Sequence, residues 1–290
     1  MANIVIDPER CRGDGICVRG CPAEVYVQRE KGARPEVVYG EFCIACGHCV
    51  ALCPHGAILH EAYPAGSVQP ILKEGTPSYE QVLELVRSRR STRAFRDQPV
   101  EKELIEKVIA GARYTPSAHN TQSTEFIVVQ DPAVLKQISR LTADYLEKII
   151  KLLRNPITRF FMRLVEGKKV QGAIRALDGF ERLIRALRQG RDRILHEAPT
   201  LILFHANQST VFAEANANLA LQNAALIAQS MGLGSFWTGY VVSVCNRDDR
   251  IPRLLCLPKG HKVYAGLAVG YPQSPFRNWV ERRPPQVTWA

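Results

Sequence analysis

Residues 41–54 of the chain read EFCIACGHCVALCP. Their four cysteines follow the spacing C-x2-C-x2-C-x3-C and stand directly before a proline: Cys43, Cys46, Cys49 and Cys53. This spacing is typical of thiolate ligands to iron-sulfur clusters. Zinc would use two C-x2-C pairs and would leave the other cysteines and the Cys-Pro pair unexplained. The run therefore favours iron and sulfide over zinc.

An earlier run repeats the spacing with one substitution. Residues 11–22 read CRGDGICVRGCP, so the same template takes Cys11, Cys17 and Cys21 and finds Asp14 in its second position. Carboxylate is a harder ligand than thiolate and suits iron in a sulfur cage less well. Two interpretations stay open: Asp14 holds a labile fourth iron, or it only makes a turn beside a three-iron cluster.

The two runs together resemble a bacterial two-cluster ferredoxin domain over about residues 1–65. In such domains the fourth cysteine of each run binds the other cluster. The resemblance implies one [4Fe-4S] cluster on Cys43, Cys46, Cys49 and Cys21. It implies a second cluster, [4Fe-4S] with the aspartate bound or [3Fe-4S] without it, on Cys11, Cys17, Cys53 and Asp14.

Composition and cysteine usage narrow the class of protein. The chain has 290 residues, 46% hydrophobic and 23% charged, which is ordinary for a globular chain of about two units. It contains no apolar run near the roughly 20 residues that span a bilayer, and its N-terminus lacks the pattern of a secretion signal. We expect a cytoplasmic protein without disulfides, in which Cys245 and Cys256 are small buried residues.

A segment rich in Pro, Gly and Ser follows Cys53 and predicts a domain boundary near residue 70. We expect an iron-sulfur domain at 1–70 and a second domain at 71–290. Apolar periodicity predicts helices in the second domain over residues 79–90, with a capping box, 101–113 and 212–232. Runs of apolar and β-branched residues predict strands over 125–130, 200–206 and 262–270. This alternation predicts an α+β fold with a central mixed sheet flanked by helices.

An insertion at about 134–195 holds most of the positive charge. Twelve Lys or Arg stand against four Asp or Glu between residues 151 and 195, while the net charge of the whole chain is +10. Apolar residues at helical spacing predict a basic amphipathic helix: Ile157, Phe160, Phe161 and Leu164. The helix could be a lid or dimer-wrapping arm, a peripheral membrane contact, or a dock for an acidic redox partner. Nucleic acid is not expected, because no binding motif accompanies the charge.

Four stretches of the second domain share one resemblance. They are RRSTRAF (89–95), TPSAHNTQSTEF (115–126), GLGSFWTG (232–239) and AVGYPQSPFRNWVERRPPQVTW (268–289). In this order they resemble the nitroreductase family of FMN-dependent oxidoreductases, over residues 78–290 without the insertion. The resemblance implies a homodimer whose subunits share each flavin site.

The resemblance also implies the residues that contact FMN. They are Arg89, Arg90, Ser91, Arg93, Pro116, Ser117, Asn120, Gln122, Thr238, Gly239 and Arg283, with Arg282 as the nearest rival of the last. Arginine suits this role because its planar guanidinium matches phosphate. Candidates for the substrate side are His119, Trp237, Tyr240 and Tyr114, which could instead be packing residues of a dimer interface. No side chain is assigned as an obligatory proton donor.

The two halves together predict a ferredoxin-fused, FMN-dependent oxidoreductase. It would pass electrons from the clusters to FMN and reduce a small organic acceptor such as a nitro compound, quinone, activated alkene or flavin. The donor would be reduced ferredoxin or NAD(P)H, although no G-x-G-x-x-G marks a nicotinamide site. The alternative is an electron-transfer module that docks to a partner redox protein and uses FMN as a relay. The sequence identifies neither the acceptor nor the donor.

Overall fold

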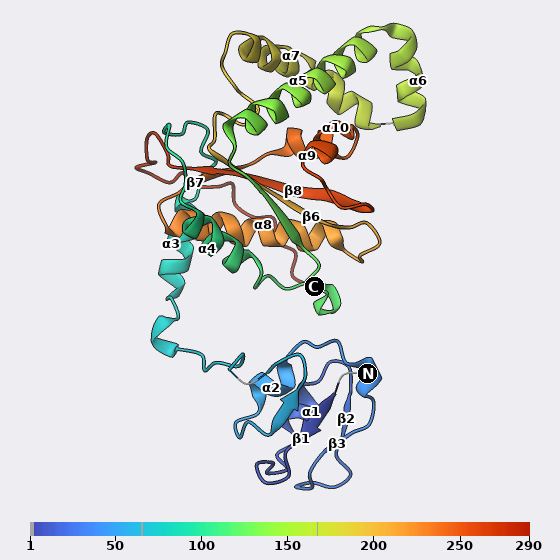
Figure 1. Cartoon of the computed structure of the whole chain (residues 1–290), viewed down its shortest axis with the longest axis vertical. Helices are drawn as coiled ribbons and strands as arrows, with labels where there is room; N and C mark the ends of the chain where they lie inside the picture. Colours follow the sequence, from blue (N-terminus) through green and yellow to red (C-terminus); the bar gives the residue numbers. More distant parts are fainter. Residues whose placement is uncertain (1–2, 65, 167) are drawn as a thin grey trace. The chain divides into compact units, whose positions relative to one another are not determined.

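The computed structural model describes residues 3–64, 66–166 and 168–290 (Figure 1). The chain forms two compact units. The first comprises Met1–Pro77 with Ser117–Thr121, and the second comprises Ser78–Pro116 with Gln122–Ala290. The division after Pro77 lies later than the expected residue 70, and residues 66–77 are exposed along their whole length. The assignment of Ser117–Thr121 to the first unit was not expected.

The first unit is built on two short antiparallel strand pairs. β1 (Ile4–Ile6) pairs with β4 (Ile58–His60), and β2 (Tyr26–Val27) pairs with β3 (Glu36–Val37). Its short helices are α1 (Ile16–Gly20), α2 (His48–Leu52), η1 (Gly40–Phe42) and η2 (Lys73–Gly75). Its small core contains thiols as well as aliphatic and aromatic side chains: Ile4, Cys17, Val25, Tyr26, Cys49 and Ile58. The pairing of β1 with β4 closes residues 4–60 into one interleaved unit.

A four-stranded sheet organises the second unit. Its strands, in the order β5-β6-β8-β7, are β5 (Glu125–Val129), β6 (Thr200–Asn207), β8 (His261–Gly270) and β7 (Gly234–Trp237). All three pairings are antiparallel, and a parallel pairing occurs at one isolated bridge between Ser91 and Ser235. The expected mixed sheet is therefore an antiparallel one with a parallel contact at its β7 edge.

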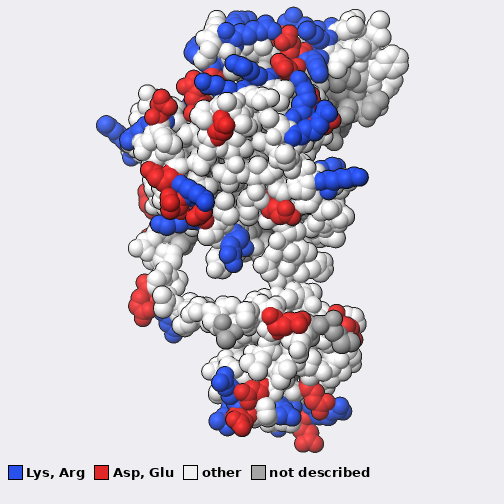
Figure 2. Space-filling model, in the orientation of Figure 1, with Lys and Arg blue, Asp and Glu red and all other residues white. Residues whose placement is uncertain are grey.

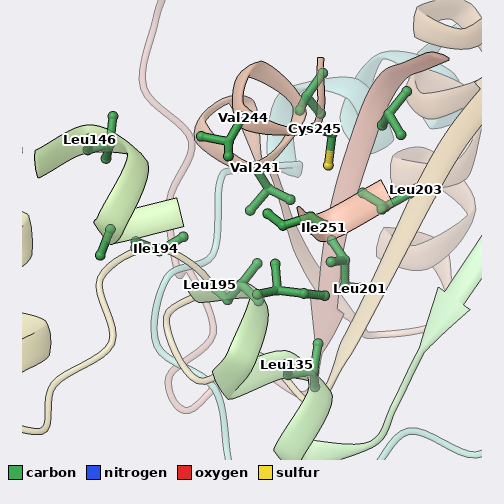
Figure 3. Packing of buried hydrophobic residues seen from close by; sticks show 14 of the residues in the cluster. Leu135, Leu146, Ile194, Leu195, Leu201, Leu203, Val241, Val244, Cys245 and Ile251 are labelled. Carbon is green, nitrogen blue, oxygen red and sulfur yellow. The ribbon is translucent and has the colours of Figure 1, made fainter. Parts of the chain in front are cut away.

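Helices cover both faces of this sheet (Figure 1). One face packs on α4 (Lys102–Ala112) and α8 (Ala213–Ser230), with Ile202 and Phe204 of β6 in the core. The alternate residues of β6, Leu201 and Leu203, face the other core, which Figure 3 shows at close range. That second core includes residues of α5 (Pro132–Arg154), α9 (Gly239–Cys245) and α10 (Arg250–Leu254). The period of two in a strand explains why β6 reads as continuously apolar.

Most predicted elements of the second unit are present. The helix expected at 79–90 is α3 (Tyr79–Ser88), and its capping box is formed: Gln81 N donates to Ser78 Oγ at 3.3 Å, and Ser78 N donates to Gln81 Oε1 at 2.9 Å. Strand β7 was not predicted, because its four residues GSFW are too few to show a strand period. The stretch TPSAHNTQSTEF contains the short helix η3 (Ala118–Asn120).

The basic insertion consists of three helices, α5 (Pro132–Arg154), α6 (Pro156–Glu166) and α7 (Lys168–Arg188). Asp131 caps α5, because its Oδ1 accepts from Ala133 N at 2.7 Å. α5 and α7 pack together and are joined by the ion pairs Arg154–Glu181 and Arg188–Glu147. Figure 2 shows Lys and Arg gathered over this part of the second unit. In the described residues no helix is both long and apolar enough to cross a membrane.

Candidate functional site

The eight predicted cluster residues line two separate cavities of the first unit. The first cavity, with about 320 Å³ free of protein atoms, has these residues in its wall: Cys21, Cys43, Cys46 and Cys49. The second, with about 300 Å³, has these: Cys11, Asp14, Cys17 and Cys53. Each cavity thus combines three positions of one run with the last cysteine of the other.

The spacing of the thiols fits a cluster better than a single ion. Zinc holds thiolates at about 2.3 Å, so the sulfurs around one ion lie within about 4 Å of one another. Among the residues that the structure describes, no three cysteine sulfurs lie within 4.8 Å of one another. A larger body, such as an iron-sulfur cube, is needed to touch all ligands of a cavity at once.

The backbone repeats between the two runs and shows what position Asp14 occupies. Gly15 before α1 and Gly47 before α2 are both left-handed, with φ of 67° and 76°. Two residues earlier, Gly13 and Ala45 are left-handed as well, with φ of 65° and 47°. Asp14 therefore lies between two left-handed residues, and so does Cys46, the second ligand of the other run.

The carboxylate of Asp14 lies in the wall of the second cavity. Its Oδ1 accepts from Ile16 N at 3.1 Å, in the turn that leads into the short helix α1. Its Oδ2 lies 3.7 Å from Nε2 of His55, and His55 lines the same cavity. One oxygen is therefore engaged in the turn, while the other is held only by a longer contact with a histidine.

Backbone amides surround the thiols in a repeated pattern. Val25 N donates to Cys21 Sγ at 3.4 Å, and Ala57 N donates to Cys53 Sγ at 3.3 Å, each four residues after its cysteine. Burial raises the pKa of Cys17 to about 11. A buried thiol of this kind ionises readily only beside a metal, because burial disfavours the isolated charged form. The donor set and its surroundings therefore fit a cluster.

A group of arginines forms the second candidate site. Arg89 ends α3 and is half-buried; burial lowers its pKa, and the neighbouring charges of Arg282 and Arg90 lower it further. In the described part of the chain none of these three arginines forms an ion pair with a carboxylate. Like charges gathered without an acidic partner are typical of an anion site. Of the two tail arginines that the sequence offers for the phosphate, Arg282 and Arg283, the one whose charge lowers the pKa of Arg89 is Arg282.

The turn between β7 and α9 lies beside this arginine-bearing segment. Ser91 bridges Ser235 of β7, and the guanidinium of Arg93 lies 5.8 Å from the ring centre of Phe236. Thr238 is buried; its N donates to Gly266 O at 2.9 Å, and its Oγ1 has no hydrogen-bond partner among the described residues. A buried hydroxyl without a partner costs free energy unless a ligand satisfies it.

His196 is a member of this region that the sequence did not reveal. Its ring meets Phe236 edge to face at 5.2 Å between centres. Burial lowers its pKa, and the positive charge of Arg93 lowers it further. The residue stands in an irregular segment before β6, where no periodicity or motif marked it.

Three of the candidate residues for the substrate side, Trp237, Tyr240 and Tyr114, are exposed and have different neighbours. Trp237 is exposed and packs against Gly239, where a Cβ would lie 2.9 Å from its ring. Tyr240 is exposed and meets Phe180 of α7 edge to face at 5.9 Å between ring centres. Tyr114 is exposed, and the guanidinium of Arg113 lies 5.6 Å from the centre of its ring. The insertion therefore borders Tyr240.

The expected flavin stretch at 116–122 is divided between the two units. Pro116 and Gln122 belong to the second unit, whereas Ser117, His119 and Asn120 belong to the first. Asn120 Nδ2 donates to the carbonyl of Ala45 at 2.6 Å, and the hydroxyl of Tyr63 donates to the same carbonyl. His119, Asn120 and Gln122 all have positive φ, between 45° and 53°. The segment is a strained turn held on the backbone between Cys43 and Cys46.

The chain matches two known families. Residues 86–271 match the nitroreductase family, and residues 3–54 match the 4Fe-4S dicluster domain. It is 27% identical over 203 residues to a protein of Methanothermobacter thermautotrophicus provisionally named NADH dehydrogenase/NAD(P)H nitroreductase, covering 69% of this chain and 81% of that one. It is 25% identical over 194 residues to the FMN reductase [NAD(P)H] of Bacillus subtilis, covering 66% of each.

Solved structures share the fold of the second unit. One is a nitroreductase with bound FMN from Bacteroides fragilis, with a TM-score of 0.52 and 19% identity. The match covers 72% of this chain and 98% of that one. Another is an FMN-dependent nitroreductase from Clostridium difficile, with a TM-score of 0.51 and 22% identity, covering 72% of this chain and 100% of that one.

Proposed function

The chain belongs to the nitroreductase family, and we propose that it is an FMN-dependent oxidoreductase supplied with electrons by two iron-sulfur clusters of its own. It would reduce a small organic acceptor such as a nitro compound, quinone, activated alkene or flavin. Bound clusters would carry electrons singly, and a bound FMN would collect two and deliver them as a pair. The observation that carries the proposal is the presence, in one chain, of two thiol-lined cavities and an arginine group that forms no ion pair with a carboxylate among the described residues.

The chain's own residues have distinct roles in this proposal. Arg89, Arg90 and Arg282 would bind the phosphate of FMN, because the charges of the other two act on Arg89 and together the three guanidinium groups supply several donors. The buried Thr238 hydroxyl would gain a partner on the flavin. Arg93 would place positive charge near the ring, which favours a reduced, anionic flavin. Trp237 and Tyr240 would flank the acceptor.

We propose that electrons leave the iron-sulfur domain at the cluster held by Cys21, Cys43, Cys46 and Cys49. The support is the Asn120 hydrogen bond to the Ala45 carbonyl, which lies between two ligands of that cluster. The same segment continues along the chain into Pro116 and Gln122, the proposed flavin contacts. Electrons would then reach the cluster beside Asp14 first and pass from it to the cluster held by Cys21, Cys43, Cys46 and Cys49.

We further propose a homodimer and a soluble electron donor, reduced ferredoxin or NAD(P)H. Dimerisation rests on the family likeness. The relatives named for NAD(P)H support a nicotinamide donor, whereas the cluster domain supports ferredoxin.

A second proposal concerns α6, which we assign to an anionic membrane surface. Its apolar side chains are exposed rather than packed: Ile157, Phe160, Phe161 and Leu164. The insertion that carries it is strongly basic, so its charge complements acidic lipid headgroups. The helix would lie in the interface and would not span the membrane.

Turnover by the purified holoprotein tests the proposed enzyme against an electron relay. The anaerobic protein is supplied with limiting NADPH or with reduced ferredoxin, and the consumption of a nitroaromatic and of a quinone is followed. Catalytic reduction of either acceptor, lost when Arg89 is replaced by Ala, is the expected result. Rapid electron exchange with ferredoxin in the absence of any acceptor reduction would favour the relay instead.

A further inference from the structure

We propose that Glu125, His205 and His261 form a binding site for a divalent transition metal, with Zn²⁺ as the preferred ion. The site lies in the second unit at one end of the sheet. It is separate from the thiol-lined cavities and from the arginine group, so it does not depend on the proposed function.

Strand register brings the three side chains together. Glu125, the first residue of β5, is the direct cross-strand partner of His205 in β6. His261, the first residue of β8, pairs with Asn207, two residues beyond His205 on β6. Because side chains alternate along a strand, positions two apart lie on the same face. The two histidines and the glutamate therefore face one another from three neighbouring strands.

The distances suit metal ligands. Nδ1 of His205 lies 3.0 Å from Nδ1 of His261, and Nδ1 of His261 lies 4.0 Å from Oε1 of Glu125. Zinc holds imidazole nitrogen and carboxylate oxygen at about 2.0–2.2 Å, so tetrahedral ligands lie about 3.3–3.5 Å apart. The observed separations bracket this value. A small rotation of the exposed Glu125 side chain would bring the third ligand to its place.

The arrangement of the histidines also suits ligation. His205 is buried, and its Nδ1 faces Nδ1 of His261. Metal binds the neutral form of an imidazole ring. In the hydrogen bond between the two Nδ1 atoms, one ring donates its proton and the other accepts it. A metal ion between the rings would bind both Nδ1 atoms at once, and the proton of the donor ring would move to its Nε2. Two imidazoles and one carboxylate form a zinc ligand set that leaves a fourth position open.

Solvent reaches the proposed site. His261 lines an open cavity of about 1110 Å³ next to α9 and α10. An ion could therefore enter without unfolding of the sheet, and a water or a small anion could take the fourth position. Among the residues that the structure describes, no other three His, Cys, Asp or Glu side chains bring their ligand atoms within 4.8 Å of one another.

Metal analysis of the intact holoprotein tests the site. Anaerobically purified full-length protein is dialysed against buffered Zn²⁺, and zinc and iron per chain are measured by mass spectrometry. We expect about one zinc per chain at this site. H261Q and E125Q should each weaken binding by at least about tenfold, which is the smallest effect seen even for groups that only support a ligand. K262Q, a neighbouring exposed residue that is not a ligand, should bind zinc as the wild type does.

The iron content and the thermal midpoint distinguish zinc at this site from zinc in the cysteine cavities. Unchanged iron in every variant shows that the clusters are intact and that zinc has not entered the cysteine cavities. Zinc should raise the thermal midpoint of the wild type and of K262Q but not of H261Q. Equal zinc content in wild type and in both ligand variants, or no zinc in any of them, would mean that the histidines form only a hydrogen bond and would overturn the proposal. E125Q carries the same test should H261Q fail to fold, because Glu125 is exposed.

Discussion

Asp14 is the residue that makes the two cluster cavities unequal. It occupies the backbone position of a ligand, between two left-handed residues, and its carboxylate lies in the cavity wall. One oxygen accepts from Ile16 N in the turn before α1, and the other approaches His55. A carboxylate so engaged is a weaker anchor for iron than a thiolate. In the proposed function, a difference between the two clusters would therefore originate at this single side chain.

Replacement of Asp14 by Cys should fix the iron at this position. We expect wild-type protein to lose about one iron per chain on mild oxidation and to take up Fe²⁺ again under reducing conditions, with the matching change in the EPR spectrum. D14C should retain its iron throughout, and D14N should lack it from the start. If all three proteins contain the same iron and give the same spectra, Asp14 is not at a ligand position.

Arg89 should carry a large part of the affinity for FMN. Loss of one charged hydrogen-bond donor to a phosphate costs about 1.5–3 kcal/mol, so R89A should bind FMN about 10-fold to 100-fold more weakly. The binding is measured by the change in flavin fluorescence during reconstitution of the flavin-free protein. R185A, which removes an exposed arginine of α7, is the matched control. Equal affinity in R89A and wild type would place the phosphate elsewhere.

At the scale of elements, periodicity predicted the regular parts of the chain and missed the irregular ones. The capping box of α3 and the apolar stretches of β6 and β8 are local signals, and each produced the expected element. Strand β7 has only four residues, too few for periodicity to appear. Its position depends on pairing with β8, a contact that sequence alone does not reveal.

The candidate sites divide in the same way. The local repeat of the cysteine spacing carried the resemblance to two-cluster ferredoxins, and that resemblance implied which cysteines share a cavity. His196, the triad of Glu125, His205 and His261, and the choice of Arg282 beside Arg89 all depend on residues far apart in sequence. Such groups come together only through tertiary structure, so no motif could predict them.

Helix α6 is the element with the clearest prediction of its own. We expect the protein to float with vesicles that contain phosphatidylglycerol at low salt, and to dissociate as salt screens the attraction. F160S/F161S should lose most of this binding. I71S/L72S removes an even more exposed apolar pair outside the insertion, and this variant should keep the binding. Equal flotation of both double variants would assign the binding to another surface.

At the scale of the whole molecule, the chain joins two kinds of electron chemistry in one polypeptide. The first unit contains the thiol-lined cavities, and the nitroreductase-family unit contains the arginine group that we propose for a flavin phosphate. The segment Ser117–Thr121 belongs to the first unit although its flanking residues belong to the second. The chain therefore passes from one unit to the other three times, after Pro77, after Pro116 and after Thr121.

Quantification of cofactors in the anaerobically purified protein tests this account most directly. Iron, sulfide and flavin are measured per chain, together with absorbance and EPR spectra before and after reduction. The account predicts about one FMN and about seven or eight iron atoms per chain, depending on whether the Asp14 cluster has lost an iron. Flavin without iron would remove the internal electron supply, and protein with neither cofactor would contradict the proposed function as a whole.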